Sequence, residues 1–353
     1  MERSNYSIKN NKERYEWIDS IKLFACFLVV FGHLWMSLMS SGLLDENNFF
    51  YCWPIQTIYS FHVPLFFVCS GFLYQKKGEY NVWTIELHIR NIQKKLLSLG
   101  IPYFIFSSIT LLFKNMFSNV VNNQATPFFK TLLFEPIAPY WYLYTLFLLF
   151  CIVPVISGKN KGKKIKMLVV TSFTIKVIYI IFLRNLGLPD LLNKIFGCLC
   201  WFCFGMFLSK YTFIKNRVNN YFVLIIFIMT ICLSVYIYGK PIDDPLIQFC
   251  FALFFVIEFV YIFQSMKTDL FQNWISKLTK YFMPVYVLHT IIASSFRIIL
   301  FKLGVTNLFI HTITGLFVSI CIPMLIYEIS LRKWWLLFLF EPQKGIKMKK
   351  ESN

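Results

Sequence analysis

Two histidines lie inside strongly apolar stretches of the chain, where an ionisable side chain is uncommon. His33 belongs to the stretch YEWIDSIKLFACFLVVFGHLW (residues 15–35), and His62 belongs to YSFHVPLFFVCSGFLY (residues 59–74). Ionisable groups at membrane depth are costly and usually face a cavity, a partner or the path of a substrate. A neutral imidazole is also a base near pH 7. Both histidines are therefore candidates for proton transfer in a site buried among helices.

A lysine precedes His33 by 11 residues. In an α-helix, 11 residues rise about 16 Å, and 11 steps of about 100° bring two side chains back to nearly the same face. Lys22 and His33 would then lie on one stripe, with the lysine at the membrane surface and the imidazole at depth. An ordinary anchoring role at the membrane surface explains Lys22 equally well. A simple interhelical hydrogen bond is a weaker explanation for His33, because an ionisable group at membrane depth is costly.

The composition identifies the elements that must position these residues as membrane helices. Of the 353 residues, 57% are hydrophobic and 15% are charged, well beyond the roughly half-apolar makeup of a soluble domain. The 35 Lys and Arg exceed the 17 Asp and Glu, but they fall between apolar runs, which fits membrane topology and excludes a nucleic-acid partner. The ten cysteines lack metal-binding spacing, so we expect no metal site.

Ten apolar stretches approach the ~20 residues that cross a bilayer as an α-helix. We therefore predict an all-α polytopic membrane bundle of about ten transmembrane helices. Lys and Arg concentrate in alternate connections, which places both termini in the cytoplasm. One membrane domain would cover residues 1–340, followed by a basic cytoplasmic tail at 341–353. The predicted spans are about 23–39, 55–74, 99–117, 138–157, 167–183, 192–209, 220–238, 246–264, 281–301 and 307–328.

Five motifs are spread over essentially the whole chain: IDSIKLFACFLVVFGH, FHVPLFFVCSGFL, LGIPYFIF, YWYLYTLFL and YVLHT. Together they resemble the acyltransferase 3 family of bacterial membrane O-acyltransferases, and within it the fucose 4-O-acetylase-related branch. The resemblance implies transfer of an acyl group, commonly acetyl, from cytoplasmic acyl-CoA to a hydroxyl of a cell-surface glycan or its lipid-linked precursor. It also implies a multi-pass protein of the bacterial cytoplasmic (inner) membrane.

The resemblance assigns roles to individual residues. His33 matches the essential histidine of the family, and Lys22 matches its basic partner, which is often arginine. A basic pair of the family precedes the Ile-Pro-Tyr of the third span; Lys95 fits its first position and Ser98 occupies its second. The residues expected to bind the phosphates of the acyl-CoA donor are Lys22, Arg90, Lys94 and Lys95.

Attack of a sugar hydroxyl on an acyl thioester needs a general base and stabilisation of the tetrahedral oxyanion. We expect His33 to act as the base and His62 to position the acceptor hydroxyl or stabilise the oxyanion. The second span runs opposite to the first after a short connection, so both imidazoles are expected to share one cavity. Asp19 and Ser70 are further candidates for support of this site.

Other intramembrane polar groups could contact the acceptor. For His289, a functional role and interhelical hydrogen bonding are equally good explanations. An unpaired carboxylate at Glu258 would be costly, so we expect it to pair with Lys176 or Arg297 or to contact the acceptor. Trp141 could stack on a sugar ring, although aromatic belts at membrane interfaces are common.

Other function classes suit some of these features. Buried histidine and glutamate side chains, a basic inner face and a proline-interrupted span would fit a transporter or a glycan flippase. Transporters often contain a pair of interrupted helices that recurs in each half of the sequence, and the two halves of this sequence show no such repeat. A structural subunit of a glycan-export complex would leave His33 replaceable. An acyl-CoA transfer or hydrolysis assay with His33→Ala as control separates these classes.

Overall fold

The chain forms a bundle of helices joined by loops. The computed structural model describes residues 15–78, 83–116, 127–211, 220–238, 244–265 and 269–352. Within these ranges there is no β-strand, and nine helices are long and apolar enough to cross a membrane. The fold is therefore an all-α polytopic bundle, as the sequence predicts. The basic N-terminal stretch, residues 1–14, lies outside the described residues, and the cytoplasmic location of both termini stays a prediction.

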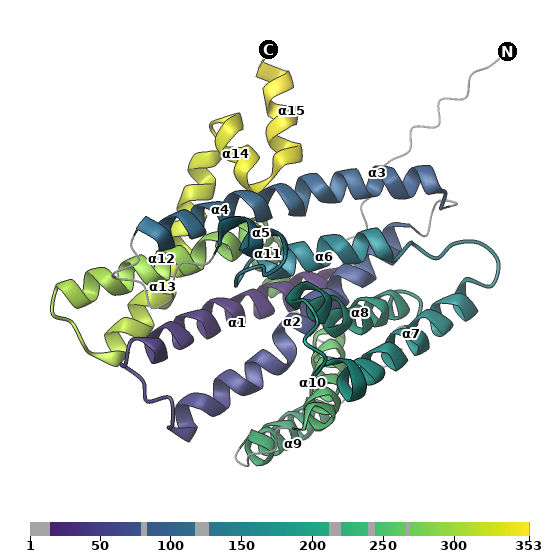
Figure 1. Cartoon of the computed structure of the whole chain (residues 1–353), viewed down its shortest axis with the longest axis horizontal. Coiled ribbons are helices and arrows are strands. Elements are labelled where there is room, and N and C mark those ends of the chain that lie inside the picture. Colours follow the sequence, from purple (N-terminus) through teal and green to yellow (C-terminus); the bar gives the residue numbers. More distant parts are fainter. Residues whose placement is uncertain are drawn as a thin grey trace.

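Figure 1 shows the course of the helices along the chain. Among the described residues, three short turns follow or join these helices, and we name them η1 and η2, which are π-helical, and η3, which is 3₁₀. In chain order the elements are α1 (Glu16–Ser40), α2 (Phe49–Lys77), α3 (Ile85–Lys95), η1 (Leu96–Gly100), α4 (Ile101–Met116), α5 (Phe128–Leu133), α6 (Trp141–Ile152), α7 (Lys161–Ile178), η2 (Tyr179–Leu183), α8 (Asp190–Leu208), α9 (Asn220–Tyr238), α10 (Pro245–Ser265), α11 (Asp269–Leu278), η3 (Thr279–Tyr281), α12 (Phe282–Lys302), α13 (Leu308–Ser330), α14 (Trp334–Phe340) and α15 (Pro342–Ser352).

Helix α2 is the most buried of the candidate spans in the described ranges, and it packs against α1, α8 and α10. Its closest neighbour is α8, because glycines stand at the crossing point. A Cβ atom on Gly71 would overlap the carbonyl oxygen of Phe202, and a Cβ atom on Gly205 would overlap that of Val68. Small residues let membrane helices approach closely, and close packing then holds them together. This crossing fixes α2, which carries His62, against α8.

The fourth predicted span is longer than the helix found there. The sequence predicts a span at 138–157, but α6 covers only Trp141–Ile152, about 18 Å of rise against a hydrocarbon core of about 30 Å. Pro139 and Pro154 flank the helix, and proline cannot donate the helical hydrogen bond. The segment before α6 is held by α12 instead: Tyr140 donates to the carbonyl oxygen of Val287 at 3.0 Å. Non-helical backbone is tolerated at membrane depth where protein surrounds it.

The residues predicted as a basic tail, 341–353, are helical up to Ser352 and pack on the bundle. Helices α14 and α15 (yellow) lie beside the continuous helix α3–η1–α4 (Figure 1). Gln343 Nε2 donates to the carbonyl oxygen of Lys94 at 2.8 Å, and Tyr327 donates to Glu341 at 2.5 Å. The C-terminal segment therefore belongs to the same packed unit as the spans.

Candidate functional site

His33 and His62 line the same cavity, of about 350 Å³, between α1, α2, α6, α8 and α12. We call it the histidine cavity. His33 comes from the outer half of α1, counted from Glu16, and His62 from the middle of α2, which runs beside α1. Trp141 and Tyr142, at the start of the short helix α6, line the same cavity. The interrupted backbone before α6 therefore serves as a wall of the cavity.

A third imidazole, His289 on α12, lies next to His33. The two ring centroids are 5.3 Å apart, and His33 interacts electrostatically with both His289 and His62. His289 is fully buried, with Nδ1 placed 3.0 Å from the carbonyl oxygen of Val285 and 2.9 Å from that of Tyr286. Because a carbonyl oxygen only accepts, Nδ1 must carry the proton, and we assign this tautomer on that ground. The Nε2 atom of His289 is then an acceptor, and it has no partner among the described residues.

His62 has the same arrangement. Its Nδ1 lies 2.7 Å from the carbonyl oxygen of Ile58, one helical turn earlier, and the side chain is buried. The proton therefore belongs on Nδ1, which leaves Nε2 of the neutral ring as an acceptor. A neutral His62 in this tautomer can accept a hydrogen bond from a hydroxyl group, but it cannot donate one to an oxyanion.

Tyr59 lies between the two cavity histidines, and sequence reasoning missed it. Its ring centroid is 6.2 Å from that of His33 and 4.8 Å from that of His62. Gly32 makes room for the ring, since a Cβ atom there would lie 2.8 Å from Tyr59 Cε2. The Tyr59 hydroxyl is buried without a partner in the described part of the chain. Its position three residues before His62, which puts both on one helix face, was the available signal.

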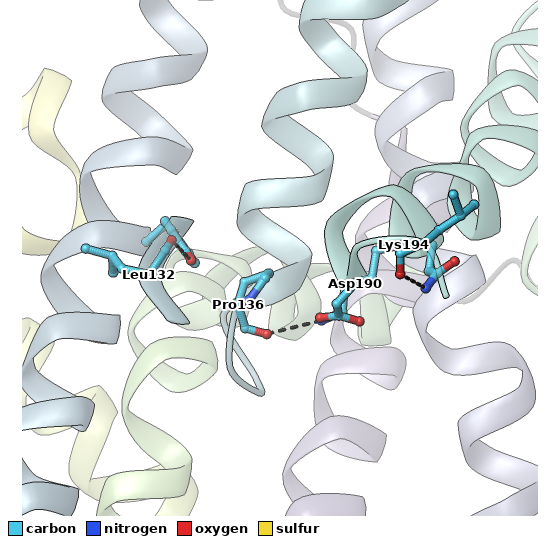
Figure 2. A network of polar contacts seen from close by, with 7 residues as sticks. Leu132, Pro136, Asp190 and Lys194 are labelled. Carbon is cyan, nitrogen blue, oxygen red and sulfur yellow. Dashed lines mark hydrogen bonds and ion pairs between the residues drawn. The ribbon is translucent and has the colours of Figure 1, made fainter. Parts of the chain in front are cut away.

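Lys194 is a second cavity residue that sequence reasoning missed. Lys194 belongs to α8, and its side chain reaches the loop before α6, where Nζ donates to the carbonyl oxygen of Pro136 at 3.1 Å and pairs with Asp190 of α8 (Figure 2). The ammonium group also lies 5.4 Å from the centre of the Trp141 ring. The spacing of four residues between Asp190 and Lys194 was the available signal, since it is typical of a helical ion pair. These contacts fix a cation at the wall of the cavity beside Trp141.

Ser70 and Asp19 lie outside the histidine cavity. Ser70 Oγ is 3.3 Å from the hydroxyl of Tyr142, which lines the cavity, so Tyr142 connects Ser70 to the cavity. Asp19 lies near the start of α1 and, like Lys22, interacts electrostatically with Cys69. The structure thus places Asp19 with Lys22, about 14 residues or roughly 21 Å of helix rise from His33.

The expected partners of Glu258 are engaged elsewhere. Arg297 donates to Ser37 Oγ at 2.7 Å, and Lys176 lies over two aromatic rings. Glu258 is 5% exposed on α10, does not line the histidine cavity, and faces Thr230 of α9. The expected pairing with Lys176 or Arg297 is wrong, because neither carboxylate oxygen of Glu258 has a hydrogen-bond partner among the described residues and α10 places the group near Thr230 of α9.

Lys22 and Lys95 come together at the other end of the bundle, with Lys77 of α2 beside them. Lys95 interacts electrostatically with both other lysines, and its Nζ lies 3.9 Å from the centre of the Phe150 ring. We call Lys22, Lys77 and Lys95 the basic cluster. Lys95 immediately precedes η1, where the hydrogen-bond ladder shifts so that the Ile101 amide bonds the carbonyl of Leu96. The shift has a local cause, since Pro102 one position later has no amide proton to continue the regular ladder.

Arg90 and Lys94 do not join the basic cluster. Arg90 is exposed and donates to Glu86 at 2.6 Å, one helical turn earlier on α3. The side chain of Lys94 is also exposed, and the spacing of four residues puts it on the same face of α3 as Arg90. Of the four residues expected to bind the donor, the structure therefore gathers two and adds Lys77, which the sequence analysis did not single out.

A second pocket of about 830 Å³ adjoins the histidine cavity. Tyr59, Ser60, Gly197 and Trp201 line both spaces, so the two are neighbours. We call the second space the polar pocket, because amide and basic side chains are prominent in its wall. In the described part of the chain, no group of three or more His, Cys, Asp or Glu residues has an arrangement that could hold a metal ion.

Comparison with known proteins places this site in a family. Residues 15–328 match the family described as Acyltransferase domain, the acyltransferase 3 family. The match spans every predicted site residue and all residues that line the two cavities. No curated protein and no solved structure matches the chain. Since the family match covers most of the chain, the protein belongs to the acyltransferase 3 family and is a multi-pass membrane acyltransferase of the O-acyltransferase type.

Proposed function

We propose that the protein moves an acyl group, commonly acetyl in the family, from cytoplasmic acyl-CoA to a hydroxyl of a cell-surface polysaccharide or its lipid-linked precursor. Its place would be the bacterial cytoplasmic (inner) membrane. The observation that carries the proposal is the arrangement along α1 and α2, with cations at one end and two imidazoles in a cavity at depth. On α1, the distance from Lys22 to His33 is about 16 Å of helix rise.

The basic cluster supports binding of the donor. Acyl-CoA carries phosphates at one end of a long flexible arm and a thioester at the other. Three lysines that repel one another are stabilised by an anion placed among them, and each can donate to phosphate oxygens. With the phosphates at the basic cluster, the arm would run along α1 toward the histidine cavity. Lysine suits this role as a point charge, although it lacks the bidentate geometry of arginine.

His33 is proposed as the general base. It would take the proton from the acceptor hydroxyl while the hydroxyl oxygen attacks the carbonyl carbon of the thioester. Collapse of the tetrahedral intermediate breaks the carbon–sulfur bond, and the imidazolium returns the proton to the departing CoA thiolate. Support comes from His289, whose ring centroid lies 5.3 Å from that of His33. Its Nε2 has no hydrogen-bond partner among the described residues and can accept an N–H of His33. His289 would thereby orient the base.

Two roles remain, positioning of the acceptor hydroxyl and stabilisation of the oxyanion, and we assign them to His62 and Tyr59. His62 uses its Nδ1 proton on Ile58, so its free Nε2 suits positioning of the acceptor hydroxyl. Stabilisation of the oxyanion needs a donor, and the buried hydroxyl of Tyr59, which has no partner among the described residues, is one. Of the two roles expected for His62, this geometry favours the positioning role.

The direct test is release of CoA from acetyl-CoA by the purified protein in lipid nanodiscs, with and without a glycan extract as acceptor. We expect His33→Gln to lose about 100-fold or more of the rate, in line with the contribution of a general base. His311→Gln is the matched control, because His311 on α13 is buried but lines neither pocket, and among the described residues its side chain hydrogen-bonds only the carbonyl of Val305, at 2.9 Å. A His33→Gln protein that is as fast as His311→Gln contradicts the proposal.

A further inference from the structure

The polar pocket lies at the end of the bundle opposite the basic cluster. It is lined by residues near the start of α2, α8 and α10 and near the end of α7 and α9, whereas Lys77 ends α2. Its volume, about 830 Å³, falls within the range of small-molecule sites, about 300–1,000 Å³. The pocket is therefore large enough to hold sugar units that approach the histidines from the side opposite the donor.

Amide side chains in the wall suit hydroxyl groups. Gln56 and Gln248 line the pocket, and within the described ranges neither amide group has a hydrogen-bond partner. Asn193 is held in place, since it accepts from Tyr179 at 3.2 Å and donates to the carbonyl of Leu188 at 3.0 Å. Amides both donate and accept, which matches the hydroxyl groups of a sugar.

Two cations line the same pocket, and neither has an acidic partner among the residues that the structure describes. Lys176 is half-buried at the end of α7, and Arg184 follows η2. Neither forms an ion pair with any described residue, and none of the described lining residues is Asp or Glu. A cation at the level of membrane helices is costly unless an anion or water compensates it. Arginine and lysine together can hold a phosphate or carboxylate by charge-assisted hydrogen bonds.

The junction of the polar pocket with the histidine cavity is shaped for a ring. Trp201 is 4% exposed and lines both spaces, which makes it a surface for stacking. Gly197 lines both spaces as well, and Lys176 Nζ lies only 3.8 Å from the position that a Cβ atom would take there. A sugar at the junction would present a hydroxyl to His33 and His62 while a charged substituent remained near Lys176.

We propose that the polar pocket binds an anionic saccharide as the acyl acceptor, through charge pairing of its phosphate or carboxylate with Lys176 and Arg184. The inference rests on the proposed function and narrows its acceptor from glycans in general to acidic ones. A phosphate could belong to a lipid-linked sugar and a carboxylate to an acidic sugar of a polymer. The experiment below separates these sources from each other and from a lipid headgroup.

Binding is measured on the full protein in nanodiscs of neutral lipid, with four probes: glucose 1-phosphate, glucuronate, glucose and glycerol 3-phosphate. We expect glucose 1-phosphate, glucuronate or both to bind at least about tenfold more tightly than glucose and glycerol 3-phosphate. If glucose 1-phosphate binds more tightly, the pocket binds a sugar phosphate. If glucuronate binds more tightly, the pocket binds an acidic sugar. If glucose binds as tightly as the anionic sugars, the requirement for an anionic group is wrong. If glycerol 3-phosphate binds as tightly as the anionic sugars, the ligand is a lipid headgroup and not a saccharide.

Variants then locate the site. Lys176→Gln and Arg184→Gln should each weaken the preferred probe about tenfold, since a charged hydrogen bond is lost. Lys302→Gln is the matched control, as this exposed lysine ends α12 outside both cavities, and it should bind as the unchanged protein does. Lys176→Arg should restore binding if charge is what matters. Full binding by Lys176→Gln and Arg184→Gln contradicts the proposal.

A final arm separates this inference from the proposed function. The His33→Gln protein should lose acyl transfer but bind the preferred probe normally, because the polar pocket does not include His33. If acyl transfer by the unchanged protein is absent while anionic probes still bind at Lys176 and Arg184, the pocket stands and the proposed reaction fails. If transfer occurs but the pocket shows no preference for anions, the reaction stands and this inference fails.

Discussion

The histidine cavity and the basic cluster differ in how firmly their side chains are held. In the cavity, backbone carbonyls fix one nitrogen of His62 and of His289, and Gly32 fixes the ring of Tyr59. In the basic cluster, lysines on long flexible stems meet by charge, and Lys95 rests on an aromatic ring. Proton transfer needs atoms at defined positions, whereas attraction of a polyanion needs mainly positive charge. Substitutions should therefore reduce kcat at the cavity and raise the donor KM at the cluster.

The largest effect is expected for the two cavity histidines taken together. His33→Gln and His62→Gln should each reduce kcat strongly, by about 100-fold or more for His33. The double variant should lose little more than the worse single variant, because groups that act on one step as a unit are strongly non-additive. Single-turnover rates of the four proteins measure the coupling. Losses that multiply as independent factors would show that His62 serves packing instead.

A smaller loss of kcat is expected for Tyr59→Phe. The ring and its contact with Gly32 remain, and only the unpartnered hydroxyl disappears. Loss of one donor to an oxyanion costs about 100-fold, the lower end of the loss expected for His33→Gln, with the donor KM little changed. Tyr51→Phe is the control on the same helix, since Tyr51 packs on Trp35 and does not line the histidine cavity. A Tyr59→Phe protein with full kcat would remove Tyr59 from the mechanism.

The smallest effect is expected at the basic cluster, where substitutions should change the KM for acyl-CoA and not kcat. Lys95→Met should raise the KM for acyl-CoA about tenfold while kcat changes little, since a charge-assisted contact to phosphate is lost. Arg90→Met should raise it less, because Arg90 is exposed and paired with Glu86. Initial rates over a range of acyl-CoA concentrations give both constants. A larger effect at Arg90 than at Lys95 would reverse the assignment of the donor site.

Much of the arrangement could be predicted from local sequence. Each long apolar run corresponds to a helix, although α6 is shorter than predicted. Whether a segment can cross the lipid depends on its own length and hydrophobicity, which can be read from the local sequence. The spacing of Lys22 and His33 puts them on one face of α1, because 11 residues make about three turns of an α-helix. The short connection between α1 and α2 made a shared location for His33 and His62 predictable.

Contacts between distant segments were beyond the reach of local sequence. His289 is 256 positions after His33 in the chain, and only the packing of α12 against α1 brings the two rings together. Lys77 at the end of α2 and Lys95 at the end of α3 interact, whereas Arg90 on α3 is exposed and pairs with Glu86. The expected pairing of Glu258 failed for this reason, since the rotation of α10 decides which neighbour a carboxyl group faces.

By itself, the sequence determined an all-α membrane bundle, the approximate spans, and two histidines as candidates for chemistry, since hydrophobicity and helical period are properties of short segments. The tertiary structure alone decided the depth and the walls of the site. It placed a broken backbone before α6 against α12, set Tyr59 between the two imidazoles, and opened a cation-lined pocket next to them. These features depend on helix crossings, and a crossing depends on side chains from both partners at once.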